Sequence, residues 1–193
     1  MPEIVSAEVE KQSINGKKVR LMFQDEGRFG RINDPRRCWA PKGIRPEVSA
    51  QIVREYTYVY AAASPHDGSM VSLILPVANT EAMSIFLAEV ASRYPDEKIL
   101  MVMDQASWHR AHELVIPENV KLTWLPPYSP QCNPVENIWD EIREKWFPNK
   151  VFQSLDAVED TLIDALVTLE NDQKRIQGIT GFDWIVSACL NAT

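Results

Sequence analysis

The feature that most constrains this sequence is the run KILMVMD at residues 98–104, which is apolar at five consecutive positions and ends in an acid. A short continuous apolar run of this kind is typical of a strand buried on both faces. Such a strand lies inside a sheet that is covered on each side. The run therefore predicts a layered α/β fold.

Other segments predict further strands. Residues 18–26 alternate loosely between apolar and polar side chains, and we expect a strand there. Residues 54–64 and 69–77 are β-rich runs separated by Pro-His-Asp-Gly, which predicts a hairpin. Residues 120–126 predict a strand that prolines stop. Residues 27–46 hold three glycines and three prolines, so we expect loop and short strands.

Helical periodicity appears in the remaining segments. Apolar residues spaced at i, i+3, i+4 and i+7 predict an amphipathic helix from Thr80 to Tyr94, capped by Asn79 or Thr80. A short helix is expected between residues 104 and 120. Further helices are expected from residue 134, around the leucine-rich stretch 155–169, and in GFDWIVSACL. The order predicts a mixed sheet flanked by helices.

Length and composition limit the classes of protein. With 193 residues and 45% apolar content, we expect one domain at residues 16–193, preceded by a tail or linker at residues 1–15. No apolar run approaches a membrane span, and the N-terminus lacks the shape of a signal peptide. We therefore expect no membrane partner. The three cysteines are far apart with no CxxC pair, which favours a reducing cytoplasm.

The charge is unevenly distributed. The net charge is −7, yet residues 16–54 carry ten Lys or Arg against four Asp or Glu, a local charge of +6. A basic segment in an acidic chain can bind a polyanion. It can equally be a solvated loop rich in arginine, and the sequence leaves both interpretations open.

Three acids stand where α/β proteins place their sites. Asp25 and Asp104 each follow an apolar run that predicts a strand, and Glu136 falls in the first turn of the next helix. Each has an ordinary structural interpretation as well. An aspartate can cap a turn, and Glu136, three residues after Asn133, can complete a capping box. Hard divalent cations bind carboxylates, and crowded carboxylates repel unless cations lie between them. The set predicts metal-assisted phosphoryl transfer.

Four blocks of sequence carry a resemblance to a known family. QDEGRFGRI, CWAPKGIRP, MVMDQASWHR and LPPYSPQCNPVENIWDEI occur in this order over residues 20–147. They resemble the blocks of the D-D-E transposases of bacterial insertion sequences, which are relatives of mariner. The resemblance implies a ribonuclease-H-like fold in which the first and fourth strands are neighbours. Two departures are Gln105, where asparagine is common, and Cys132, where leucine is common.

The same resemblance implies the site and its partners. The metal-binding catalytic acids would be Asp25, Asp104 and Glu136, holding two Mg²⁺ or Mn²⁺ ions in the active complex. Glu136 would then serve as both cap and metal ligand. The partner would be DNA, bound by a homo-oligomer. Such transposases usually carry an N-terminal helix-turn-helix region, which we expect to be encoded separately, lost, or absent from a catalytic fragment.

Other residues are weaker candidates. The DNA backbone could be held by side chains that follow Asp25 and Asp104: Arg28, Arg31, Arg36, Arg37, Lys42, Arg45 and His109. His109 and His112 have a spacing that could hold zinc, although packing or a phosphate contact explains it better. Three tryptophans could stack on bases or belong to the core: Trp39, Trp108 and Trp124.

Three functions remain open from the sequence. The first is a transposase domain that cleaves DNA and transfers strands. The second is a ribonuclease-H-like nuclease that only hydrolyses. The third is an inactive or domesticated relic that binds DNA or assembles. The proline-rich block favours transposition over simple hydrolysis, and the intact set of acids argues against a relic.

Overall fold

The computed structural model describes residue 7, residues 18–33 and residues 35–190. Apart from Ala7, the predicted tail or linker at residues 1–15 therefore lies outside the described residues. None of the described helices is long and apolar enough to cross a membrane.

The described part of the chain forms one five-stranded sheet in the order β3-β2-β1-β4-β5. The strand β1 pairs antiparallel with β2 and parallel with β4, which confirms that the first and fourth strands are neighbours. The remaining pairs are antiparallel for β2 with β3 and parallel for β4 with β5. The strands are β1 (Val19–Ile32), β2 (Ile52–Ala63), β3 (Met70–Leu75), β4 (Lys98–Met103) and β5 (Val120–Trp124).

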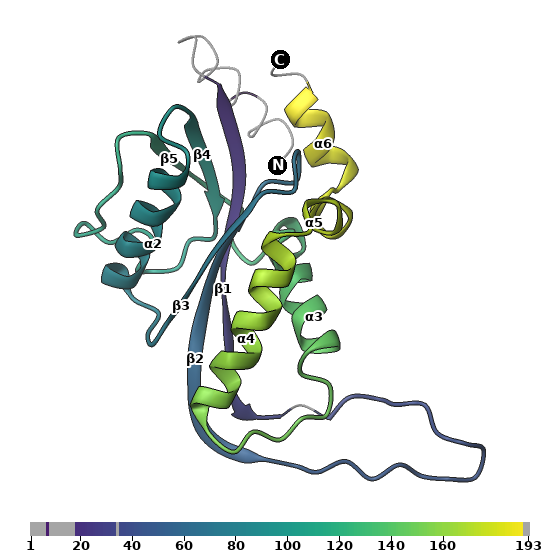
Figure 1. Ribbon diagram of the computed structural model, residues 1–193. Coiled ribbons are helices and arrows are strands. Elements are labelled where there is room, and N and C mark those ends of the chain that lie inside the picture. The colour runs from purple at the N-terminus through teal and green to yellow at the C-terminus, as the bar shows by residue number, and fades with distance from the viewer. Residues whose placement is uncertain (1–6, 8–17, 34, 191–193) are drawn as a thin grey trace.

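Helices cover both faces of this sheet (Figure 1). One face is covered by α2 (Thr80–Arg93), and Asn79 caps this helix by accepting a hydrogen bond from the Ala82 amide, as predicted. The helices on the other face are α3 (Glu136–Lys145), α4 (Leu155–Glu170), α5 (Gln173–Thr180) and α6 (Asp183–Leu190). A 3₁₀ turn, η1 (Pro130–Cys132), precedes α3.

The central strand β4 joins two separate cores. Ile99, Met101 and Met103 pack in the cluster under α2, whereas Leu100 and Val102 pack in the cluster under α3 to α6. All five side chains are at most 1% exposed. The prediction of a strand buried on both faces is therefore confirmed, and its apolar run follows from having no solvent-facing side.

The strand β1 is longer than the sequence predicts. The sequence predicts that it ends near Asp25, with loop and short strands from residue 27, but it continues unbroken to Ile32, so the prediction is wrong for residues 27–32. Gly27 lies inside the strand at a point where aromatic rings pack closely against the backbone. A Cβ atom there would lie 2.8 Å from the Phe29 ring and 2.9 Å from the Trp139 ring. Glycine here makes room for a neighbouring ring, and the sequence pattern cannot show that.

Two connections also differ from the prediction. The short helix expected between β4 and β5 is wrong, because residues 104–119 form turns without a helix. Between β1 and β2, residues 35–51 form a long extended segment that leaves the body of the molecule (Figure 1). Its base is fastened by Asn33, whose side chain bonds the Ser49 carbonyl and the Gln51 amide.

Candidate active site

The three predicted acids face one cleft. Asp25, Asp104 and Glu136 all line a cavity of about 410 Å³, although they come from three different elements. Another wall of the cavity is formed by residues 125–130, the proline-rich stretch between β5 and α3. The structure thus brings together residues that are up to 111 positions apart in the sequence.

Strand register explains why the two aspartates are neighbours. Phe23 and Val102 form the last residue pair between β1 and β4, after which β1 continues beside β2 alone. Asp25 lies two residues beyond Phe23, and Asp104 lies two residues beyond Val102. Parallel register therefore puts both acids at the same level of the sheet. Asp25 lies where β1 extends beyond the end of β4, and not at the end of its own strand as predicted.

Asp25 is a buried carboxyl with one strong partner. Its Oδ2 accepts a hydrogen bond of 2.6 Å from Nε1 of Trp139 on α3. The pKa of Asp25 is raised to about 8: burial is the main cause, the Trp139 bond opposes it, and the negative charges of Glu136, Glu26 and Asp104 add to the rise. In the absence of a cation, Asp25 therefore favours its neutral form near pH 7.

Asp104 is held differently, by a histidine. Its Oδ1 lies 2.7 Å from Nδ1 of His109 and accepts a 2.9 Å hydrogen bond from the Ala106 amide. The bond from His109 holds the pKa of Asp104 below its ordinary value, against the effect of burial. Asp104 is thus kept ionised while Asp25 favours its neutral form, so neighbouring acids have opposite shifts.

The expectation that His109 contacts DNA is corrected by its burial. The residue is only 2% exposed, and its other ring nitrogen, Nε2, lies 2.7 Å from Oε1 of Glu26. Although burial lowers the pKa of His109, the bonds to Asp104 and Glu26 raise it to about 9. A phosphate cannot reach a ring enclosed in this way. Sequence reasoning also missed Glu26, because an acid next to a predicted site residue gives no separate signal.

Glu136 begins α3 without completing the predicted capping box. The backbone N–H of Asn133, which that box would give to the Glu136 carboxylate, donates to the Pro130 carbonyl, so this part of the prediction is wrong. The Asn133 side chain accepts a bond from the Val135 amide and donates one to the Gln24 carbonyl, which ties the start of α3 to β1. Burial raises the pKa of Glu136, and nearby Arg143 lowers it. The carboxylate is therefore not needed to close the helix.

The donor set suits a hard divalent cation. Three carboxylates face one cleft, and the pKa values of Asp25 and Glu136 are raised by burial first and by neighbouring acids second, so a bound cation would favour the ionised form of both. Among residues 18–33 and 35–190, no three His, Cys, Asp or Glu side chains already stand around one point as ligands. This also leaves the His109–His112 zinc pattern without a third ligand in that part of the chain.

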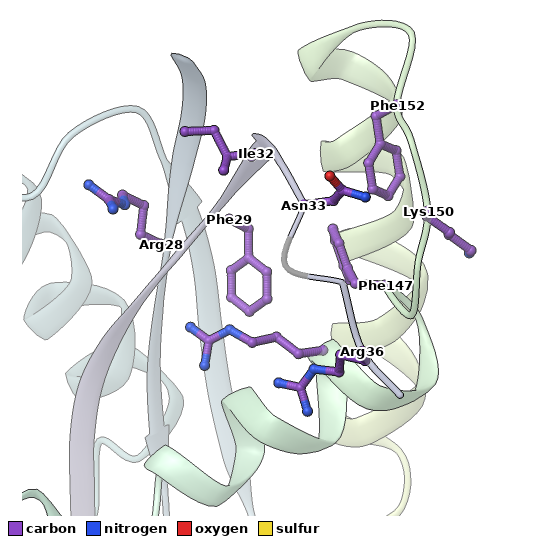
Figure 2. Close-up of a pocket in the computed structure, with 10 residues that line it drawn as sticks. Arg28, Phe29, Ile32, Asn33, Arg36, Phe147, Lys150 and Phe152 are labelled. Carbon is purple, nitrogen blue, oxygen red and sulfur yellow. The ribbon is translucent and has the colours of Figure 1, made fainter. Parts of the chain in front are cut away.

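A second, basic pocket lies farther along β1 and α3 (Figure 2). Its floor holds three phenylalanines, Phe29, Phe147 and Phe152, and its described lining includes four cationic residues, Arg28, Arg36, Arg143 and Lys150, with no acid. Two of these, Arg143 and Lys150, were missed because they lie outside the basic segment 16–54. The seven-residue spacing from Glu136 to Arg143, two helical turns, is the signal that could have found Arg143.

Of the other predicted DNA contacts, some form ion pairs within the protein and the rest are exposed on the extended segment. Arg31 bonds Glu55 and the Phe152 carbonyl, and its side chain is 17% exposed, so it fastens the fold. Arg36 forms ion pairs with Glu144 and Asp140. The remaining candidates, Arg37, Lys42 and Arg45, are exposed on the extended segment 35–51.

The three tryptophans differ in exposure and in their contacts. Trp39 is fully exposed on the extended segment. Trp108 donates to Glu26, and Trp124 packs against the core under α2. Trp39 thus presents its whole ring to solvent, where a base could stack, while the other two are partly buried and have structural contacts.

Known proteins resemble this chain in sequence. Residues 20–159 match the family model described as DDE superfamily endonuclease. The protein y4pE/y4sA of Sinorhizobium fredii, which is uncharacterized, is 35% identical over 130 residues, covering 67% of this chain and 96% of that protein.

Solved structures are similar in fold. The catalytic domain of Mos1 mariner transposase matches with a TM-score of 0.58 at 12% identity, covering 97% of this chain and 90% of that one. The Mos1 paired-end complex with Mn matches with a TM-score of 0.63 at 14% identity, covering 100% of this chain and 60% of that one. This chain thus spans about 60% of the transposase in that complex. The predicted ribonuclease-H-like fold is confirmed. The chain belongs to the DDE superfamily endonuclease family.

Proposed function

We propose that this chain is the catalytic domain of a transposase that cleaves DNA and joins the cut strand to a target. The observation that carries the proposal is the convergence of Asp25, Asp104 and Glu136 on one cleft. A mixed sheet with two of these acids at its β1–β4 junction and the third at the start of α3 is a framework for phosphoryl transfer, because that chemistry needs positioned charge more than a reactive side chain.

The three acids would hold Mg²⁺ or Mn²⁺, with two ions in the active complex. When bound, such ions supply Lewis acidity toward an attacking water or 3′-hydroxyl and toward the departing oxygen. The chain itself contributes orientation: Trp139 fixes one oxygen of Asp25, and His109 fixes one oxygen of Asp104. Support for divalent ions also comes from the structural neighbours, which include Mos1 complexes with Mn and with Mg.

DNA would approach across the basic residues next to the cleft. From Glu136 to Arg143 is about 10 Å along α3, close to three base pairs along a duplex axis. We place backbone phosphates against Arg28, Arg36 and Arg143, with the exposed side chains of Arg37, Lys42 and Arg45 reaching a more distant stretch. Recognition of a specific sequence would come from a helix-turn-helix region outside residues 16–193, and the active form would be a homo-oligomer on DNA.

Cleavage and joining can be measured together. The chain is incubated with Mn²⁺, a labelled duplex that ends in the inverted repeat flanking its coding sequence, and a supercoiled target plasmid. We expect nicked duplex and branched joined product, both lost in Asp25→Asn and Asp104→Asn. Nicking without joining would identify a nuclease that only hydrolyses. Absence of both products, with the purified helix-turn-helix region added, would identify an inactive relic and overturn the proposal.

A further inference from the structure

Three ionisable side chains form a continuous row behind the cleft. His109 lies between Glu26 and Asp104, with both ring nitrogens 2.7 Å from a carboxylate oxygen. The side chains of Glu26 and His109 are 8% and 1% exposed, whereas that of Asp104 is 54% exposed. The row thus runs from the protein interior to the carboxylate that reaches the cleft.

Glu26 has the position of a support and not of a metal ligand. Successive side chains of a strand point to opposite faces, so Glu26 points away from its neighbour Asp25. It is absent from the residues that line the cleft. Its Oε1 already accepts hydrogen bonds from Nε2 of His109 and from Nε1 of Trp108. A buried carboxylate with two fixed donors is well suited to hold a ring in one orientation.

The bonds to Asp104 occupy only one of its oxygens. Both Nδ1 of His109 and the Ala106 amide contact Oδ1, and no described residue donates to Oδ2. Asp25 has the same arrangement, because its one side-chain donor, Nε1 of Trp139, contacts Oδ2. Each aspartate is therefore fixed through one oxygen by a ring N–H from a buried side chain, and the other oxygen is left for a cation.

Asp104 needs this support because of its place in the chain. It follows the last residue of β4 and begins a stretch of turns, so no strand pairing fixes its backbone. A half-exposed side chain there would lose rotamer freedom on binding a cation, which weakens binding. Bonds that order the side chain beforehand remove that cost.

We propose that Glu26 and His109 are positioning residues for metal binding: His109 fixes the Asp104 carboxylate with Oδ2 directed to the cation, and Glu26 fixes the His109 ring. This rests on the proposed function, because it assumes that Asp104 binds a divalent cation. Residues that hydrogen-bond the ligands of a metal typically change its affinity about 10- to 100-fold when they are replaced.

Two substitutions of one residue separate the two bonds of His109. Asparagine places an amide N–H near the position of Nδ1, and glutamine places one near Nε2. We expect His109→Gln, which loses the bond to Asp104, to weaken Mn²⁺ binding about 10- to 100-fold in a titration followed by electron paramagnetic resonance without DNA. His109→Asn should recover most of the affinity. The matched control is His112→Gln, at an exposed position three residues on, and should bind as wild type does.

The possible results are distinct. Wild-type Mn²⁺ affinity in His109→Gln would overturn the proposal, and so would equal losses in the Gln and Asn variants that follow a loss of thermal stability. If His109→Gln fails to fold, Glu26→Gln has nearly the same shape and carries the test. Weaker Mn²⁺ binding at unchanged thermal stability supports the positioning role, and unchanged binding overturns it. Failure of the proposed function has its own signature, because Asp25→Asn and Asp104→Asn would then bind Mn²⁺ as wild type does.

Discussion

At the scale of single residues, the cleft combines acids that differ in what holds them. Asp25 is buried beside Trp139, Asp104 is paired with His109, and Glu136 has no capping bond to maintain. Burial and like charge raise the pKa of Asp25 and of Glu136, whereas an ion pair lowers that of Asp104. These differences make the role of each acid separately testable.

Glu136→Gln should separate structure from chemistry. Because Glu136 forms no cap, the variant should keep its stability within about 0.5 kcal/mol in urea denaturation. It removes a charge that a cation needs, so Mn²⁺-dependent cleavage should fall by several orders of magnitude. Near-wild-type cleavage of a DNA end by this variant would exclude Glu136 from the site. Asp140→Asn, at an exposed acid one turn along α3, is the matched control and should retain cleavage.

The raised pKa of Asp25 predicts how stability depends on pH without metal. The folded pKa is about 8 and the ordinary value is 3.8, so the folded protein binds the proton more tightly than the unfolded chain. The resulting stabilisation is fully present below the ordinary value and is lost as pH rises through about 8. We expect the unfolding midpoint of the metal-free protein to fall between about pH 5 and pH 8 more steeply than that of Asp25→Asn.

His109 contributes in the same direction, because its folded pKa is also raised, and it remains in the variant. The difference between the two pH profiles is therefore the quantity assigned to Asp25. Superimposable profiles in the presence of a chelator would contradict the burial of its charge.

At the scale of elements, the site depends on how closely α3 approaches β1. Trp139 lies over Gly27 and reaches Asp25, so one ring contact sets the distance between helix and strand. Phe29 continues this contact, edge-on to Trp139 and under the guanidinium of Arg143. The same packing that brings Glu136 to the cleft thus also places the basic pocket beside it.

Gly27→Ala should disturb this approach. Its Cβ would lie 2.8 Å from Phe29 and 2.9 Å from Trp139, so a buried ring must move. We expect a loss of about 1–3 kcal/mol in unfolding free energy, with weaker Mn²⁺ binding as the Trp139–Asp25 bond is strained. The matched control is Gly178→Ala in α5, where a Cβ meets nothing within 4 Å and helix propensity predicts a gain of about 0.5–1 kcal/mol. Equal stability in the two variants would refute the packing argument.

At the scale of the whole molecule, charge and shape predict weak DNA binding. The chain has a net charge of −7, yet the basic pocket and the segment 35–51 gather cationic side chains on one part of it. We expect this chain alone to bind duplex DNA without strong sequence preference, with an affinity that falls as salt rises. Fluorescence anisotropy against random duplexes measures both properties, and a strong preference for one sequence would place recognition within this chain.

A pair of variants locates that binding on the molecule. Arg143→Gln should weaken binding evenly across sequences and lower the slope of log affinity against log salt by about 1, since one phosphate contact is lost. Lys174→Gln, at an exposed lysine on α5, should leave the slope unchanged. Equal slopes in wild type and Arg143→Gln would remove the basic pocket from the interface.

The sequence alone was sufficient for whatever depends on neighbours along the chain. Apolar period predicted α2 and α4, the turn Pro-His-Asp-Gly predicted the β2–β3 hairpin, and the run KILMVMD predicted a strand buried on both faces. Block order predicted the family, which residues 20–159 confirm. The identity of the three acids as catalytic residues remains a prediction that their common cleft supports.

Only the tertiary structure determined what depends on residues distant in sequence. Gly27 appeared to break β1, but it admits a ring from a residue 112 positions later. His109 is predicted to contact phosphate, but the fold encloses its ring between Glu26 on β1 and Asp104 after β4. Glu136 is predicted to complete a capping box, but the Asn133 amide donates to the Pro130 carbonyl instead, and the Asn133 side chain bonds β1. Local patterns record the backbone's preferences, whereas burial and charge pairing arise from chain segments that meet only when the sheet and its helices pack.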